Sequence, residues 1–178
     1  MAERQGQTVP DALLTRIGQV VMLHHGGDRE EARRRLLALW TEVGEDGAPL
    51  HRCTLAHYLA DTHDDPSDEL AWDLRALSAA QEHAGSVEVR ALYPSLHLNL
   101  AADYVRLGRA EAARSHVRRA RTAAVALRDD SYGDGVRAAI SRMELRLGEG
   151  RDEGLADPGD GGGGPGRWEG HGEWEREW

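Results

Sequence analysis

The chain has 178 residues and a formal net charge of -9 at pH 7, because 31 Asp and Glu residues outnumber 22 Lys and Arg residues. This length fits one domain, or one domain and a tail. The acidic balance argues against general nucleic-acid binding, which depends on neutralising phosphates with basic side chains. No stretch reaches the roughly 18 apolar residues of a membrane span, and residues 1–10 contain no apolar core of a secretory signal. We therefore expect a cytoplasmic protein that binds neither nucleic acid nor membranes.

The residue types present exclude several classes of enzyme. The chain contains no lysine, and both a phosphate-binding P-loop and a Schiff-base nucleophile require one. Neither G-x-S-x-G nor H-E-x-x-H occurs in the sequence. The single cysteine, Cys53, lies within an apolar helical pattern, which predicts a buried and inert thiol. We expect no cofactor and no enzymatic activity.

The first two expected helices form a pair. We expect a flexible N-terminus at 1–9 and a first helix over 11–25, which Gly26 and Gly27 end. Asp28 and Glu31 have the spacing of a capping box for a second helix that runs to Val43. Apolar residues recur every three or four positions in both segments, so each helix has one face to bury.

The next two expected helices run over 50–61 and 66–81. Asp65 before Pro66 is typical of a cap followed by proline in the first helical turn. Leu70, Leu74 and Leu77 form the apolar stripe of the fourth helix, and we expect Trp72 to pack against a neighbouring hairpin.

The clearest pattern is the stretch 94–127, which predicts two antiparallel helices with a stop at Gly108. Ala113 and Ala120 belong to an alanine-rich stripe on the second of these helices, which lets two backbones approach closely. A last amphipathic helix is expected over 132–147, as a cap on the stack.

This hairpin resembles a tetratricopeptide repeat, a motif of about 34 residues. The residues that carry the resemblance are Leu100, Ala101, Tyr104, Gly108, Ala113, Val117 and Ala120. The family's leading Trp is replaced by His97, and Val125 stands in place of its Pro. The resemblance implies an all-α fold over 10–148, in which about three degenerate helix hairpins and a capping helix form a right-handed stack.

The same resemblance implies a protein or peptide interaction module that uses a concave groove. Carrying the register of Tyr104 to the earlier hairpins predicts the residues that line this groove: His24, His25, Thr54, His57, Asp61, Asn99 and Arg106. Asn99, the only asparagine, matches a position where the family often holds a peptide backbone, and the alternative is a bond to the neighbouring helix. The lysines of the family's carboxylate clamp are absent, so recognition of chaperone C-termini is not implied.

Two alternative functions remain open at this point. One is a small metal-dependent hydrolase that uses His57, Asp61 and a histidine of the first helix, and the other is a regulatory domain that binds a small ligand in the groove. His51, His57 and His63 recur every six residues and so lie on different helical faces, which argues against a shared metal. The arginines of 114–121 are either a basic patch for an acidic partner or a solvated helix face.

Residues 149–178 are rich in glycine and acidic residues, which predicts a disordered tail. Its tryptophans, Trp168, Trp174 and Trp178, either form a short motif that docks in a groove, even the chain's own, or have no fixed partner.

Overall fold

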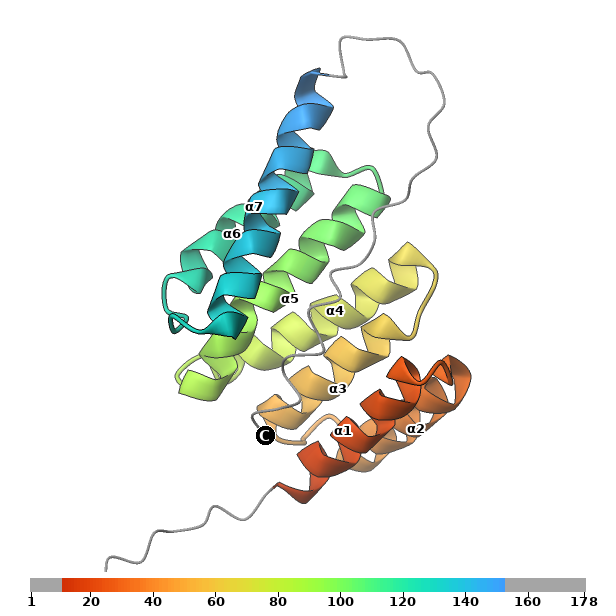
Figure 1. The fold of residues 1–178 in the computed structure, drawn as a ribbon. Helices are drawn as coiled ribbons and strands as arrows, with labels where there is room; N and C mark the ends of the chain where they lie inside the picture. Colours follow the sequence, from red (N-terminus) through yellow and green to blue (C-terminus); the bar gives the residue numbers. More distant parts are fainter. Residues whose placement is uncertain (1–10, 153–178) are drawn as a thin grey trace, which may run out of the picture.

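A computed structural model describes residues 11–152, with the side chains of 11–148, and this part of the chain is built of α-helices alone. The expectations for 1–9 and for the tryptophan-containing tail lie outside the described residues. The seven helices, shown in Figure 1, are α1 (Ala12–His25), α2 (Arg29–Val43), α3 (Pro49–Asp61), α4 (Pro66–Gln81), α5 (Val87–Arg106), α6 (Ala110–Ala124) and α7 (Ser131–Asp152). None of them has the length and apolarity needed to cross a membrane.

Side-chain caps fix where several helices begin. The carboxylate of Asp65 accepts hydrogen bonds from the backbone N–H groups of Ser67 and Asp68, and Pro66 occupies the first turn of α4, as predicted. The carboxylate of Asp28 likewise accepts from the N–H of Glu31 at the start of α2. These bonds satisfy donors that a helix leaves unpaired in its first turn.

Two predicted stops coincide with backbone that favours glycine. Gly27 after α1 has a φ of 92°, and Gly108 after α5 has a φ of 70°. Residues with a Cβ rarely adopt these angles, so glycine there lets the chain turn back at little cost. The two turns place α2 against α1 and α6 against α5.

The structure corrects the expected limits of two helices. The helix α5 begins at Val87, with Ser86 as its cap, so Pro94 lies inside it rather than at its start. Proline lacks an N–H donor, and one backbone hydrogen bond of α5 is therefore missing at Pro94. The helix α7 extends to Asp152, five residues beyond its expected end at Leu147, so residues 149–152 are helical and do not belong to the disordered tail expected from 149.

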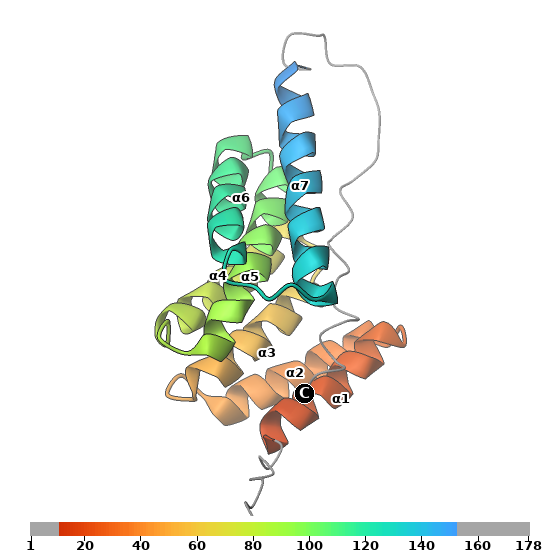
Figure 2. The same ribbon diagram turned by 60° about the vertical axis from the view of Figure 1, so that its left-hand side comes forward.

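The helices pack in the order of the chain, each against the next. Contacts also join α1 to α3 and α5 to α7. In Figure 1 the odd-numbered helices follow one another along the molecule, and Figure 2 shows α7 standing beside α5 and α6. The core consists of three apolar clusters, the first shared by α1–α3, the second by α3–α5 and the third by α5–α7. The shared helices α3 and α5 make the stack continuous.

A pair of tryptophans joins the first hairpin to the second. The rings of Trp40 on α2 and Trp72 on α4 meet edge to face, with centroids 5.2 Å apart. The guanidinium carbon of Arg75 lies over the Trp72 ring, 4.7 Å from its centroid. The predicted packing of Trp72 against a neighbouring hairpin is confirmed.

Candidate functional site

The helix α5 lies in the middle of the stack and is buried from Pro94 to Asp103. Because α4, α6 and α7 pack against α5, the polar residues of this segment are buried together with its leucines. Four of these polar side chains are at least nine-tenths buried, namely Ser95, His97, Asn99 and Asp103. Buried polar groups need hydrogen-bond partners, and their partners define the candidate site.

Asp73 on α4 is fully buried and lies at the centre of a group of polar side chains. Its carboxyl group interacts with Asp103 and Asn99 of α5, and its Oδ1 lies 3.6 Å from Nδ1 of His57 on α3. Asp61, one turn after His57, adds a third carboxyl group near Asp73 and Asp103. We call His57, Asp61, Asp73, Asn99 and Asp103 the inner polar cluster.

Burial and like charge make the carboxyl groups of this cluster hard to ionise. Burial raises the pKa of Asp73 well above its usual range, and the charge of Asp61 raises it further. Burial, followed by the charge of Asp73, raises the pKa of Asp103 to about 9. Arg106 lowers the Asp103 pKa, but burial and Asp73 outweigh it. At neutral pH, Asp103 is therefore protonated.

A neighbouring layer of charges lies one helical turn away. Arg106 of α5 pairs with Glu69 of α4, whose side chain is 3% exposed, and its second nitrogen donates to the backbone carbonyl of Asp64, at 2.8 Å. Arg106 thus ties α5 to α4 and to the chain between α3 and α4. A carboxylate buried this deeply requires such a cation.

Asn99 bridges α5 and α3. Its Nδ2 lies 3.3 Å from Nδ1 of His57, and its side chain also bonds to Asp73. This bond lowers the pKa of Asp73, as a donor to a carboxyl group does, so the NH₂ end of Asn99 faces His57 and Asp73. Its carbonyl oxygen, Oδ1, is buried and accepts no hydrogen bond from any residue within the described part of the chain.

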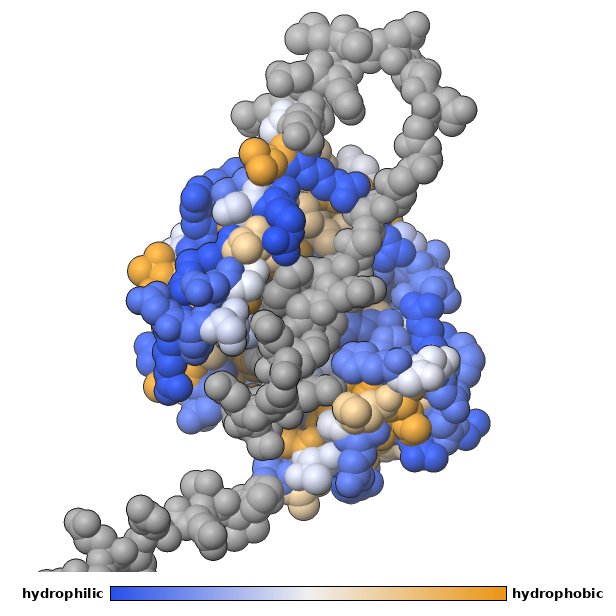
Figure 3. All heavy atoms as spheres, viewed as in Figure 1, coloured by the Kyte–Doolittle hydropathy of each residue, from blue (hydrophilic) through white to orange (hydrophobic). Residues whose placement is uncertain are grey.

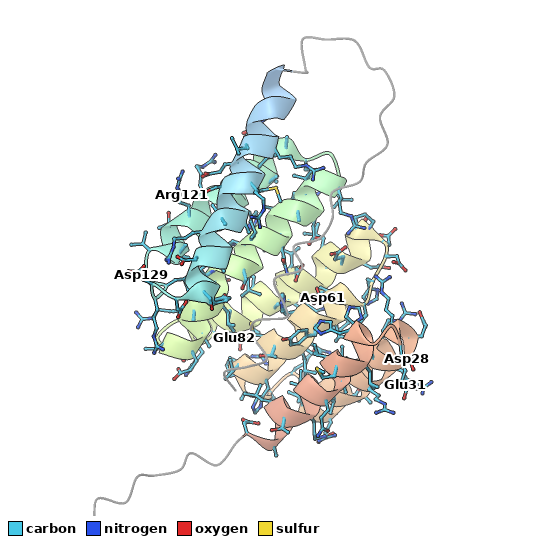
Figure 4. All side chains as sticks on the ribbon, in the orientation of Figure 1. Asp28, Glu31, Asp61, Glu82, Arg121 and Asp129 are labelled. Carbon is cyan, nitrogen blue, oxygen red and sulfur yellow. The ribbon has the colours of Figure 1, made fainter. Side chains whose placement is uncertain are left out.

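The structure brings together three of the predicted groove residues, His57, Asp61 and Asn99. Arg106 lies beside them, paired with Glu69. The hydroxyl of Thr54 donates to the carbonyl of Leu50 in its own helix. His24 and His25 lie in the last turn of α1, with ring centroids 5.8 Å apart. In Figure 4, Asp61 lies toward the middle of the molecule, whereas Asp28 and Glu31 lie at its edge.

The residues of the hydrolase alternative do not form a recognisable metal centre. Among the side chains of 11–148, no three or more His, Cys, Asp and Glu residues are arranged to hold a metal ion. His51 bonds through Nε2 to Asp11, at 2.7 Å, and the ring of His63 stacks on Trp72. Cys53 is buried, and burial raises the pKa of its thiol to about 12, as expected for an inert cysteine.

The sequence analysis did not identify Glu69, Asp73 and Asp103. The signal was present, because all three stand at positions of an apolar helical stripe. Asp73 falls between Leu70 and Leu77 with the spacing of one helical face, and Asp103 follows Asn99 by one turn. A charged residue on a buried stripe indicates a polar contact inside the core.

The arginine-rich stretch 114–121 lies on α6, and two of its arginines are paired. Arg114 bonds to Glu111 and to the backbone carbonyl of Leu147, and Arg121 bonds to Glu144 of α7. A pocket of about 220 Å³ lies beside them, lined by Arg114, Val117, Arg118, Glu144, Leu147 and Gly148. At this face, the ion pair of Arg121 with Glu144 and the hydrogen bond from Arg114 to the carbonyl of Leu147 join α6 to α7.

Over residues 11–152, fold and site together define an all-helical arrangement of seven helices packed in sequential pairs, with a buried cluster of carboxyl groups between α3, α4 and α5. No protein-family model, curated protein or solved structure matches the chain.

Proposed function

We propose that the chain is an interaction module that resembles tetratricopeptide repeats, with a right-handed stack and a groove that binds a segment of a partner protein. The contact between Asn99 of α5 and His57 of α3 carries the proposal. Together with the packing of α1 on α3 and of α5 on α7, it supports a continuous layer of odd-numbered helices. In helical-repeat proteins such a layer forms the binding surface.

The surface around this layer fits a water-exposed module. Figure 3 shows mainly hydrophilic residues on both flanks of the face seen in Figure 1, with apolar residues gathered toward its lower edge, where α1 lies. Met22 of α1 is 60% exposed. Polar flanks with an apolar strip are typical of surfaces that bind extended segments.

Selection of linear peptides from a displayed library, followed by NMR mapping on the full chain, tests this proposal. A selected peptide should shift backbone resonances of α1, α3, α5 and α7. His25 is exposed at a predicted groove position, so His25→Ala should weaken binding, whereas His83→Ala, at an exposed site after α4, should not. Failure to select any peptide, or shifts confined to α2, α4 and α6, would contradict the proposal.

A further inference from the structure

We propose that the inner polar cluster is a binding site for an alkylammonium group, with the oxygens of Asn99 and Asp103 as its acceptors and the carboxyl group of Asp61 nearby. The inference deepens the proposed function, on which it rests for the source of the ligand: a lysine side chain of the bound segment. A free alkylamine offers the same chemistry and is distinguished below.

Unused acceptors are the first observation. Oδ1 of Asn99 and Oδ2 of Asp103 accept no hydrogen bond from any residue that the structure describes. Both side chains are almost completely buried, at 2% and 1% exposure. An unpaired buried oxygen is costly, and both oxygens belong to the same face of α5, one turn apart. An ammonium group carries three donors and so can bond to several acceptors at once.

The charges that face the cluster favour a cation. His57 and Asp61 contribute from α3, Glu69 and Asp73 from α4, and Asp103 and Arg106 from α5. Arg106 is bound to Glu69 and to the carbonyl of Asp64, so the arginine that faces the cluster already has a carboxylate partner. The chain has no lysine of its own, so an alkylammonium side chain must come from another molecule.

Part of the cluster lies near the surface. The side chain of His57 is 12% exposed and that of Arg106 is 25% exposed, whereas Asp73 is fully buried. We expect a ligand to reach the cluster beside His57 and Arg106, where a slender alkyl chain with a terminal charge needs less room than a planar guanidinium group.

Binding should release protons. Because the Asp103 pKa is about 9, its carboxyl group carries a proton at neutral pH. An arriving ammonium favours the ionised carboxylate, so the carboxyl proton passes to the buffer. The exchange replaces one positive charge in the cluster by another.

The single asparagine provides a direct readout. Selective ¹⁵N labelling of asparagine gives one backbone and one side-chain signal, both from Asn99. Titration with n-butylammonium chloride should shift these signals saturably, while calorimetry in two buffers shows proton release. Sodium chloride at equal ionic strength and n-butanol should produce neither effect.

Asp103→Asn keeps the shape of the side chain and removes its ability to ionise when the ammonium group binds. It should weaken n-butylammonium binding about tenfold or more, the effect of losing one charge-assisted hydrogen bond. Asp129→Asn, at a fully exposed side chain, should have no effect. Unsaturable shifts in the unaltered chain, or equal affinity in the two variants, would overturn the inference, and the first result holds even if Asp103→Asn does not fold.

Further outcomes of these experiments separate this inference from the proposed function. In a selected peptide that contains lysine, Lys→Met should weaken binding if the partner supplies the ammonium group. Saturable n-butylammonium binding without any selected peptide supports a site for a free alkylamine and contradicts only the interaction module. Peptides that bind regardless of lysine, with no n-butylammonium shift, overturn the inference and leave the module standing.

Discussion

At the scale of single residues, two buried histidines join α5 to α6. The Nδ1 atoms of His97 and His116 lie 3.1 Å apart, so one ring donates its Nδ1 proton to the other. Burial, then the charges of His116 and Arg119, lowers the pKa of His97 to about 4. Burial and Arg119 also lower the pKa of His116. Protonation of both rings would place two N–H groups face to face, so the pair favours neutral histidine.

We expect the His97–His116 pair to make the fold sensitive to acid. The unfolded chain protonates His97 near pH 6.5 but the folded chain only near 4, so the pair's contribution is present above 6.5 and is lost as the pH falls from 6.5 to 4. The loss should be roughly 3 kcal/mol for this buried group, because each unit of pKa difference between the folded and unfolded chain corresponds to about 1.4 kcal/mol. Urea unfolding at several pH values measures it.

His97→Gln isolates this effect from the aspartates, whose raised pKa values give the opposite slope. The variant should lose less stability between pH 6.5 and 4 than the unaltered chain. His25→Gln, at an exposed site, should follow the unaltered chain. If the free energy of unfolding of His97→Gln and of the unaltered chain falls equally between pH 6.5 and 4, the pair is not the cause of the loss of stability in acid.

At the scale of helices, the seam between α5 and α6 is lined by small residues. Ala113, Ala120 and Ala124 of α6 belong to one buried cluster with Leu98 and Ala101 of α5. Ala113 has no exposed surface. Side chains this small allow close approach of two backbones, and larger ones would push the helices apart.

Ala113→Leu should therefore destabilise the fold by about 1–3 kcal/mol, because the added methyl groups have no space. Ala138→Leu is a matched control, since Ala138 is exposed on α7. Alanine and leucine are both good helix formers, so the substitution itself has little effect on helix propensity. Thermal unfolding followed by circular dichroism compares the two. Equal melting temperatures would mean that the α5–α6 seam is loosely packed.

The existence of all seven helices was predictable, because stripes, caps and glycine stops agree at most boundaries. The start of α5 was not, although Val89 and Leu92 extend the stripe of Leu96 to positions before Pro94. Proline is typical of a first helical turn, and that local preference favoured a start at Pro94. Burial of α5 on several sides outweighs the cost of the hydrogen bond that is missing at Pro94. This burial is visible only in the packed structure.

At the scale of the whole molecule, the inner polar cluster was only half predictable. The register that identified His57, Asp61 and Asn99 depends on one hairpin and its periodicity. The partners Asp73 and Glu69 come from α4, and which face of α4 meets α5 depends on the loop between α3 and α4 and on the Trp40–Trp72 contact. Residue spacing in the sequence predicts which side chains share a face of one helix. The inner polar cluster, however, is formed by residues of three helices, α3, α4 and α5.

The three apolar clusters predict that the stack does not unfold as one unit. The first cluster meets the rest through α3 and through Trp40 on Trp72, and in stacked repeats stability is a sum of local and nearest-neighbour terms. Trp40→Ala should cost about 2–3 kcal/mol and speed hydrogen exchange in α1 and α2, while α6 and α7 remain protected. Mass spectrometry of exchanged peptides measures this, with Met22→Ala, at an exposed site of α1, as the control. Equal acceleration in all seven helices would show instead that the apolar clusters open together.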